Sequence, residues 1–172
     1  KIAGLKNLSE ILWTLIAMTT EELGADRGSL FLNDPLTGEL YSRVAQGDLT
    51  REIRILNTTG IAGSIFQSGE GEIIHNAYED ERFNSKIDEQ TGYVTKNIVC
   101  APVRTVRNDV IGVIQILNKK RGRFTKEDLD IVEAITAQAA VSLQNAQGME
   151  EMVKSREKEM QFLDIVSDVT AE

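Results

Sequence analysis

Apolar residues recur at every third or fourth position over residues 1–24. This spacing places them on one stripe of an amphipathic helix, and Gly24 follows as a residue that commonly ends helices. The stripe is longer than one small core requires, so we expect part of it to contact a second subunit. Its members are Ile2, Leu5, Leu8, Ile11, Leu12, Leu15, Ile16 and Leu23.

The middle of the chain changes to the pattern of strands, with apolar residues at alternate positions or in short unbroken runs. Turn-forming residues at 33–38 join the first two strands into a hairpin. Residues 110–117 are apolar on both faces, so we expect this strand at the centre of a sheet covered on both sides. Strands are expected at residues 27–32, 40–44, 52–55, 72–74, 97–106 and 110–117.

Helical spacing returns at about Lys126 and continues beyond Gly148. Grouped strands with helices packed on them, and no strict alternation of strand and helix, predict an α+β fold around a central antiparallel sheet. We expect an N-terminal helix at residues 1–24, a main domain at 25–147 and a C-terminal connecting helix at 148–172.

The connection at residues 76–95 is unusually long for a compact domain. Connections of more than about a dozen residues are often lids or binding loops. Phe83, Ile87 and Tyr93 recur along this one. We therefore expect it to pack on the domain as a cover, and we call residues 76–95 the lid.

Two other places favour a cavity beneath the lid. Gly60 and Ala62 are small residues at the start of a short helix preceded by a threonine cap, and a helix N-terminus favours an anion. An ordinary capped helix is the simpler alternative. Gln115 is the polar residue of the central strand. A buried amide must find partners, so it either bonds neighbouring loops or points into a cavity.

The composition argues against several classes of function. The chain has 172 residues and a formal net charge of −8, whereas a nucleic-acid-binding protein needs a basic face to neutralise phosphates. No run of about 18 apolar residues that would span a membrane is present. Cys100 is the single cysteine and His75 the single histidine. An internal disulfide is therefore excluded, no metal site is expected, and a reducing, cytoplasmic location is expected.

Several motifs in this order are similar to those of a known family. They are Gly60-Ile61-Ala62-Gly63, Asn76-Ala77-Tyr78, Arg82-Phe83-Asn84, Asp88, Thr91 to Pro102 and Gly112 to Lys119. Together they resemble the GAF domains of cyclic-nucleotide phosphodiesterases and bacterial adenylyl cyclases, over about residues 8–147. The resemblance implies a regulatory domain that binds a cyclic nucleotide under the lid and does not turn it over.

The resemblance also implies which residues form the site. The backbone N–H groups of Ile61 and Ala62 would hold the cyclic phosphate, and lid residues would bond the ribose, base or phosphate. The implied ligand contacts are Ser29, Ala45, Gln46, Ile61, Ala62, Asn84, Asp88, Thr91, Thr95 and Gln115. We expect Thr95→Ala to weaken nucleotide binding while leaving the stability of the unliganded domain nearly unchanged.

Three positions favour cyclic AMP over cyclic GMP. The cyclic-GMP pockets of the resembled phosphodiesterases carry an aromatic residue and an acid where this chain has Ala45 and Gln46, and an acid where it has Gln115. An acid accepts from the ring N–H and amino group of guanine, whereas adenine needs both a donor and an acceptor, which glutamine, threonine and backbone supply. We expect cyclic AMP as the bound regulatory ligand, with cyclic GMP as the alternative and no other cofactor.

A family signature that ties the end of the central strand to the last helix, and so steadies the lid, falls on Asn118, Lys119, Phe124 and Asp128. Its final acidic residue is replaced by Leu129. Because Lys119 still has Asp128 as a partner, we expect these four residues to act as a structural clasp and not as ligand contacts.

Three functions follow from this sequence as alternatives. The first is a sensory domain, not an enzyme, whose ligand acts through the connecting helices of a homodimer on an output domain such as an adenylyl cyclase. The second is a ligand-free GAF domain that serves as a dimerisation spacer. The third is an enzyme or chromophore domain, since some relatives reduce methionine sulfoxide or bind bilin, but those need cysteines where this chain has none.

Overall fold

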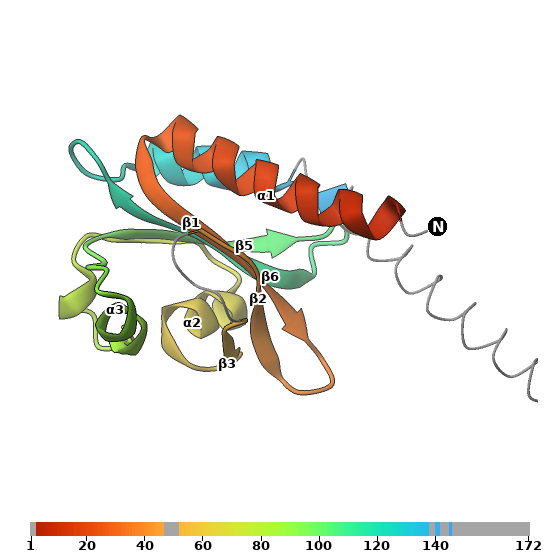
Figure 1. Ribbon diagram of the computed structural model, residues 1–172, viewed down its shortest axis with the longest axis horizontal. Helices are drawn as coiled ribbons and strands as arrows, with labels where there is room; N and C mark the ends of the chain where they lie inside the picture. The colour runs from red at the N-terminus through yellow and green to blue at the C-terminus, as the bar shows by residue number, and fades with distance from the viewer. Residues whose placement is uncertain (1–2, 47–51, 138–139, 142–144, 146–172) are drawn as a thin grey trace, which may run out of the picture.

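The computed structural model of the chain describes residues 3–46, 52–137, 140–141 and 145. A six-stranded sheet lies at its centre, with the strand order β3-β2-β1-β6-β5-β4 and antiparallel pairing throughout. Helices cover both faces of the sheet (Figure 1). The expected α+β fold is therefore confirmed, and β6 occupies the central position that its apolar faces predict.

Each expected strand is present, and its ends lie within two residues of the predicted ones. The elements are α1 (Ala3–Leu23), β1 (Ala25–Asp34), β2 (Glu39–Ala45), β3 (Arg54–Leu56), α2 (Gly60–Ser68), β4 (Glu72–Ile74), the 3-10 turn η1 (Ala77–Glu79), α3 (Lys86–Thr91), β5 (Ile98–Arg104) and β6 (Val110–Lys119). A further helix follows at residues 126–137.

One face of the sheet is covered by α1 and the helix at residues 126–137 (Figure 1). The apolar stripe of α1 supplies Leu12 and Ile16, which are fully buried against Leu30 of β1. Gly28 permits this close approach, because a Cβ there would lie 2.9 Å from a methyl carbon of Ile16 and 3.0 Å from one of Thr20. We call this side the core face.

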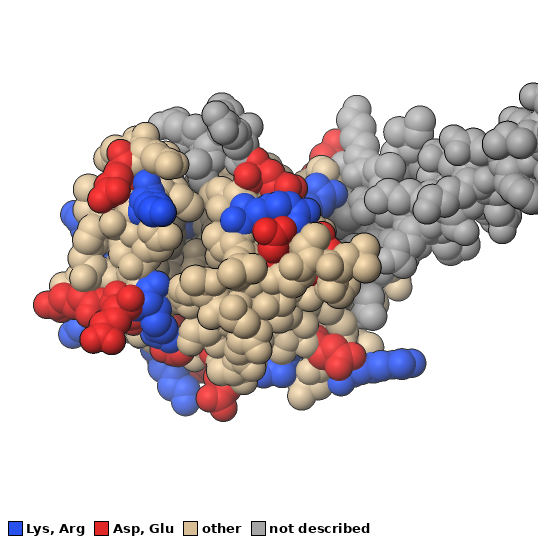
Figure 2. Space-filling model, turned by 90° about the horizontal axis from the view of Figure 1, so that it is seen from below, with Lys and Arg blue, Asp and Glu red and all other residues tan. Residues whose placement is uncertain are grey.

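The opposite face is covered by α2 and the lid. Phe31 and Val113 of the sheet pack here against Ile61, Ala62 and other apolar residues. Basic side chains lie beside acidic ones over this side of the molecule (Figure 2). The described residues on this side therefore form no uniformly basic surface of the kind that nucleic acids require. We call this side the cavity face.

The lid contains more regular structure than its polar sequence predicts, since it holds η1 and α3. Asn84 opens α3 by accepting a hydrogen bond from the Lys86 N–H through Oδ1 at 3.0 Å. Gly92 closes it in the left-handed conformation (φ 76°) and donates its N–H to the Asp88 carbonyl at 2.8 Å. The expectation that the lid packs on the domain is confirmed, because Phe83 joins the apolar cluster of the cavity face.

The expected connecting helix at residues 148–172 lies outside the described residues, as does residue 147. On α1, Ile11, Trp13 and Met18 are exposed apolar side chains. A subunit contact through the terminal helices stays a prediction, and so does a cytoplasmic location. Among the described residues, none of the helices is both long and apolar enough to cross a bilayer.

Candidate functional site

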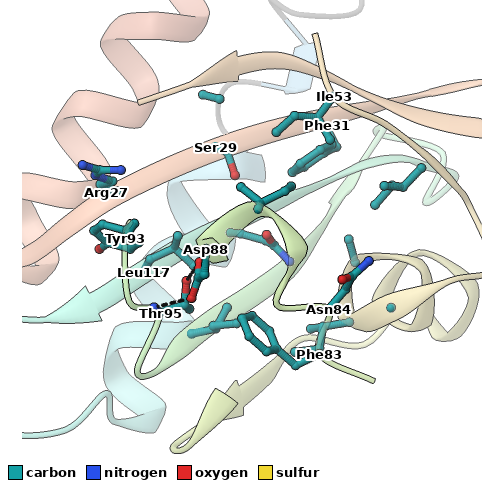
Figure 3. Close-up of a pocket in the computed structure, with 18 of the residues that line it drawn as sticks. Arg27, Ser29, Phe31, Ile53, Phe83, Asn84, Asp88, Tyr93, Thr95 and Leu117 are labelled. Carbon is teal, nitrogen blue, oxygen red and sulfur yellow. Dashed lines mark hydrogen bonds between the residues drawn. The ribbon is translucent and has the colours of Figure 1, made fainter. Parts of the chain in front are cut away.

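A cavity of about 230 Å³ lies between the sheet, the start of α2 and the lid (Figure 3). All ten residues expected to contact a ligand line this cavity, although they come from β1, β2, α2, the lid and β6. They are Ser29, Ala45, Gln46, Ile61, Ala62, Asn84, Asp88, Thr91, Thr95 and Gln115. The fold thus brings together the whole set, while their contacts with a ligand stay a prediction.

The floor of the cavity carries a row of polar side chains across the sheet. Gln115 of β6 is paired with Ser29 on β1 and with Cys100 on β5. Of the two orientations open for Gln115, the one into the cavity is confirmed. Burial raises the pKa of the Cys100 thiol to about 12. Cys100 is therefore protonated at neutral pH, and as a fully buried residue of β5 it serves as part of the core.

The start of α2 forms one end of the cavity. Thr59 precedes it in an extended conformation, but its side chain makes no capping hydrogen bond, so the expected threonine cap is wrong in this respect. Gly60 begins the helix in the left-handed region (φ 72°). The N–H groups of Ile61 and Ala62 belong to the first turn and have no acceptor within the helix. They and the helix dipole favour an anion at this end.

Asp88 lies on the underside of the lid, where its side chain is buried. Its carboxylate accepts hydrogen bonds from the Thr95 N–H at 2.7 Å, the Thr95 hydroxyl at 2.9 Å and the Tyr78 hydroxyl at 2.7 Å (Figure 3 shows Asp88 and Thr95). The hydrogen bond to Asp88 raises the pKa of Tyr78 to about 12. These hydrogen bonds connect the beginning of the lid, at Tyr78, with Asp88 of α3 and with the last lid residue, Thr95.

This arrangement corrects the expectation for Thr95→Ala. The Thr95 hydroxyl already donates its proton to a buried carboxylate, so towards a ligand it can only accept a hydrogen bond. Removing it leaves Asp88 one hydrogen bond short, which costs about 1–3 kcal/mol when the remaining group is buried. We therefore expect the substitution to destabilise the unliganded domain, because the hydrogen bonds of Thr95 to Asp88 connect two parts of the lid.

The other two polar lid residues expected in the site, Asn84 and Thr91, also have partners within the lid. The Thr91 hydroxyl donates to the Ile87 carbonyl at 2.9 Å and accepts from the Tyr93 N–H at 3.3 Å. Asn84 uses its side-chain oxygen at the start of α3. Both residues line the cavity, so a ligand would meet side chains whose orientation is already set.

Gln46 is also hydrogen-bonded within the domain, to the backbone of Gly28. The side-chain oxygen of Gln46 accepts a hydrogen bond from the Gly28 N–H at 2.9 Å, and the backbone N–H of Gln46 donates to the Gly28 carbonyl at 3.0 Å. The amide NH₂ is the part of the side chain that remains to face a ligand. Gln46 therefore presents a donor at this point of the cavity.

Sequence reasoning missed most of the apolar wall and both arginines of the cavity. The missed lining residues include Arg27, Phe31, Ile53, Ile55, Arg82, Phe83, Ile87, Tyr93, Ile98 and Leu117. Alternation along β1 was the available signal, because side chains two residues apart share a face. Since Ser29 was expected in the site, Arg27 and Phe31 follow from the same period.

Arg82 fixes the lid to the domain. Its guanidinium pairs with Glu72 at 3.0 Å and with Asp80 at 2.8 Å, and it also donates to the Ser64 hydroxyl at 3.0 Å. The hydrogen bonds to Asp80 and Glu72 raise its pKa further above the ordinary arginine value. Its donors are therefore occupied, and its role is structural.

Tyr93 holds the far end of the lid. Its hydroxyl donates to Asp26 Oδ2 at 2.7 Å and accepts from Asn118 Nδ2 at 2.8 Å. The Arg27 guanidinium lies over the Tyr93 ring, with Cζ 4.0 Å from the ring centroid. Burial, followed by the hydrogen bond to Asp26, raises the pKa of Tyr93. Tyr93 stays protonated and keeps this contact between the lid and β1.

The four residues of the expected clasp lie together at the end of β6. Asn118 accepts from the Lys96 N–H at 2.6 Å and donates to the Val94 carbonyl at 2.8 Å, which holds the end of the lid. Lys119 pairs with Asp128 at 2.7 Å, as expected despite Leu129. Phe124 is almost fully buried beside them.

These features define a GAF domain. The GAF domain family matches residues 7–143, and the chain belongs to that family. The solved GAF domain of a phosphoenolpyruvate-protein phosphotransferase from Coxiella burnetii superposes with a TM-score of 0.75 over 84% of this chain and 86% of that chain. At 18% sequence identity, this likeness supports the fold alone.

Two curated relatives are more similar in sequence. One is the probable 3′,5′-cyclic phosphodiesterase pde-5 of Caenorhabditis elegans, 39% identical over 155 residues, which are 83% of this chain and 21% of that protein. The other is the dual 3′,5′-cyclic-AMP and -GMP phosphodiesterase 11 of Drosophila melanogaster, 38% identical over 160 residues, 83% of this chain and 11% of that protein. The chain thus spans about a fifth or less of these relatives.

Proposed function

We propose that this chain is a regulatory domain that binds a purine 3′,5′-cyclic nucleotide in the cavity under the lid. One observation carries the proposal: ten residues from separate segments converge on a single cavity whose one end is the free first turn of α2. The cyclic phosphate would lie at Ile61 and Ala62, where N–H groups and the helix dipole meet an anion.

The rest of the cavity suits a nucleoside. Phe31, Ile98 and Leu117 supply apolar surface for the flat faces of a purine. Ser29 and Gln115 on the floor, and the NH₂ of Gln46, supply a small number of polar groups that can orient it. A site with apolar walls and a few placed polar groups is typical of small-molecule binding.

Binding without turnover is the role that fits these residues. Asp88 is the one carboxylate among the described residues that line the cavity. Its oxygens already accept three hydrogen bonds from the lid. A carboxylate held in this way is committed to structure and is not placed to act as a general base.

The relatives also bear on the output. Both are named as phosphodiesterases, and neither name supports the adenylyl cyclase output or the preference for cyclic AMP that the sequence suggested. We therefore assign the chain to the regulatory part of a longer phosphodiesterase. A ligand that orders the lid would act on the terminal helices, and dimerisation through those helices belongs to the same proposal.

A thermal-shift titration tests this function. The chain is melted with cyclic GMP and with cyclic AMP at up to millimolar concentration. At 100 times the dissociation constant a ligand adds about 2.7 kcal/mol to the stability of the folded state, which raises the melting temperature by roughly 2–4 °C per kcal/mol for a chain of this size. We expect a saturable rise with at least one of the two nucleotides.

The matched controls are 5′-GMP and 5′-AMP, which carry the same bases without the cyclic phosphodiester. We expect a much smaller rise with them. No rise with either cyclic nucleotide would refute the sensor function and favour the ligand-free dimerisation spacer.

A further inference from the structure

Two arginines line the cavity, and they differ in what already binds them. Arg82 is paired with Glu72 and Asp80. Arg27 makes no ion pair within the described part of the chain, and its guanidinium lies over the Tyr93 ring. Its guanidinium N–H donors are therefore available to a molecule in the cavity.

Arg27 lies at the end of the cavity opposite to α2. Side chains 27, 29 and 31 of β1 face the cavity, and Phe31 packs with Ile61 and Ala62 at the start of α2. Four residues of a strand span about 13 Å, so the backbone of Arg27 lies about that far along β1 from Phe31. Figure 3 shows Arg27 beside Tyr93, with Ser29 further along β1 and Phe31 beyond Ser29.

Tyr93 also orients Arg27. Arg27 Cζ lies over the Tyr93 ring, 4.0 Å from its centroid, and the hydroxyl of that ring is itself held by Asp26 and Asn118, so this contact limits where the guanidinium can lie. A planar guanidinium presents parallel N–H donors along one edge, and this fork suits two neighbouring acceptors. Because the fork is already held in place, less side-chain entropy is lost when it binds.

The two purines differ at the edge that such a fork would meet. Guanine offers two neighbouring acceptors, O6 and N7, whereas adenine offers N7 beside an amino group that donates. An arginine fork bonds both guanine acceptors and meets a donor on adenine. With the phosphate at α2, the purine is the part of a cyclic nucleotide that extends towards Arg27.

We infer that Arg27 recognises the O6 and N7 edge of guanine, so that the site selects cyclic GMP over cyclic AMP. This inference rests on the proposed function. It reverses the preference drawn from Ala45, Gln46 and Gln115, because that preference considered the ring N–H and amino group of guanine and not its O6 and N7. Arg27 discriminates through an edge for which the sequence comparison of acids gave no information.

Calorimetric titration of the wild-type chain and the Arg27→Met variant with cyclic GMP and cyclic AMP tests the inference. A bidentate contact with guanine is worth about 1–3 kcal/mol, so we expect Arg27→Met to weaken cyclic GMP binding by about tenfold or more. The dissociation constant for cyclic AMP should change by less than about threefold. Arg27→Lys keeps the charge without the fork and should also lose most of the discrimination.

Arg82→Met is the matched control, since it removes the other cavity arginine and should weaken both nucleotides alike. A ligand change tests the same contact without a mutation: the wild-type chain should bind 7-deaza cyclic GMP, which lacks the N7 acceptor, more weakly than cyclic GMP. This arm keeps the inference testable if Arg27→Met fails to fold.

Two results would overturn the inference: equal losses for both nucleotides in Arg27→Met, or equal affinity of the wild type for cyclic GMP and its 7-deaza analogue. The first result would assign Arg27 to the phosphate. Failure of the proposed function is a separate outcome, in which the wild-type chain binds neither cyclic nucleotide.

Discussion

The two faces of the sheet use the same strand for opposite purposes. On β1, Leu30 and Leu32 point to the core face and are completely buried among apolar side chains of α1 and the sheet. Ser29 and Phe31, their neighbours in the chain, point to the cavity face. Adjacent residues of one strand therefore serve the packed core and the candidate binding site.

The difference lies in how each face is completed. The core face is filled by side chains that fit one another, with Gly28 allowing α1 to approach. On the cavity face, polar side chains are hydrogen-bonded to one another around the cavity. Asp88 accepts from Tyr78 and Thr95, and Arg82 donates to Glu72 and Asp80. We therefore expect core substitutions to change stability first, and cavity substitutions to change ligand binding as well.

Leu30→Ala should have the largest effect on stability. Truncating a fully buried leucine costs about 2–5 kcal/mol, because apolar contacts are lost and a cavity remains. Denaturant unfolding should show this loss. Nucleotide affinity of the molecules that remain folded should be nearly unchanged, since Leu30 does not line the cavity.

Ser29→Ala is the matched control on the adjacent residue. It should change the free energy of unfolding by less than about 0.5 kcal/mol, as is usual away from buried contacts, and weaken nucleotide binding. The comparison of the two faces fails if Leu30→Ala lowers affinity more than Ser29→Ala does.

Thr95→Ala should have an intermediate effect on stability. The loss of its hydroxyl leaves Asp88 with two of three hydrogen bonds in a buried setting, so we expect a cost of about 1–3 kcal/mol. Nucleotide binding should weaken too, because the lid loses a connection. Thr95→Ser is the control that keeps the hydroxyl, and unchanged unliganded stability in Thr95→Ala would contradict the positioning role.

Tyr78→Phe should have the smallest effect, because the Tyr78 side chain is exposed and water can replace its hydroxyl as a donor to Asp88. Its particular consequence should be visible in alkaline solution. The hydrogen bond to Asp88 raises the pKa of Tyr78 from 10.0 to about 12 in the folded chain. Its contribution to stability is therefore complete below pH 10 and is lost as the pH rises towards 12. Unfolding measurements over this range should show a shallower decline for Tyr78→Phe than for the wild type, and identical declines would disprove the coupling.

Much of the fold follows from local patterns. The period-two strands and the stripe of α1 depend on burial that repeats along the chain, so they are visible without tertiary information. The start of α2 follows from the same elementary rules, whereas those rules left two orientations open for Gln115, and the structure places it in the lining of the cavity. The motifs of the resembled family then indicated the set of residues that the fold brings together.

The missed features depend on contacts between distant segments. The short helix α3 is polar and has six residues, too few to show a helical period. Thr95 gives no sign in sequence that its hydroxyl is committed to Asp88, seven residues away across a turn. Likewise, the availability of Arg27 and the saturation of Arg82 appear only when their neighbours are in place.

A crystal structure of the chain with cyclic GMP tests the central claim most directly. Density for the nucleotide should fill the cavity, with the cyclic phosphate at the N–H groups of Ile61 and Ala62 and the O6 and N7 edge of guanine at Arg27. A bound nucleotide outside the cavity, or one whose base lies at α2 and whose phosphate lies at Arg27, would contradict the account.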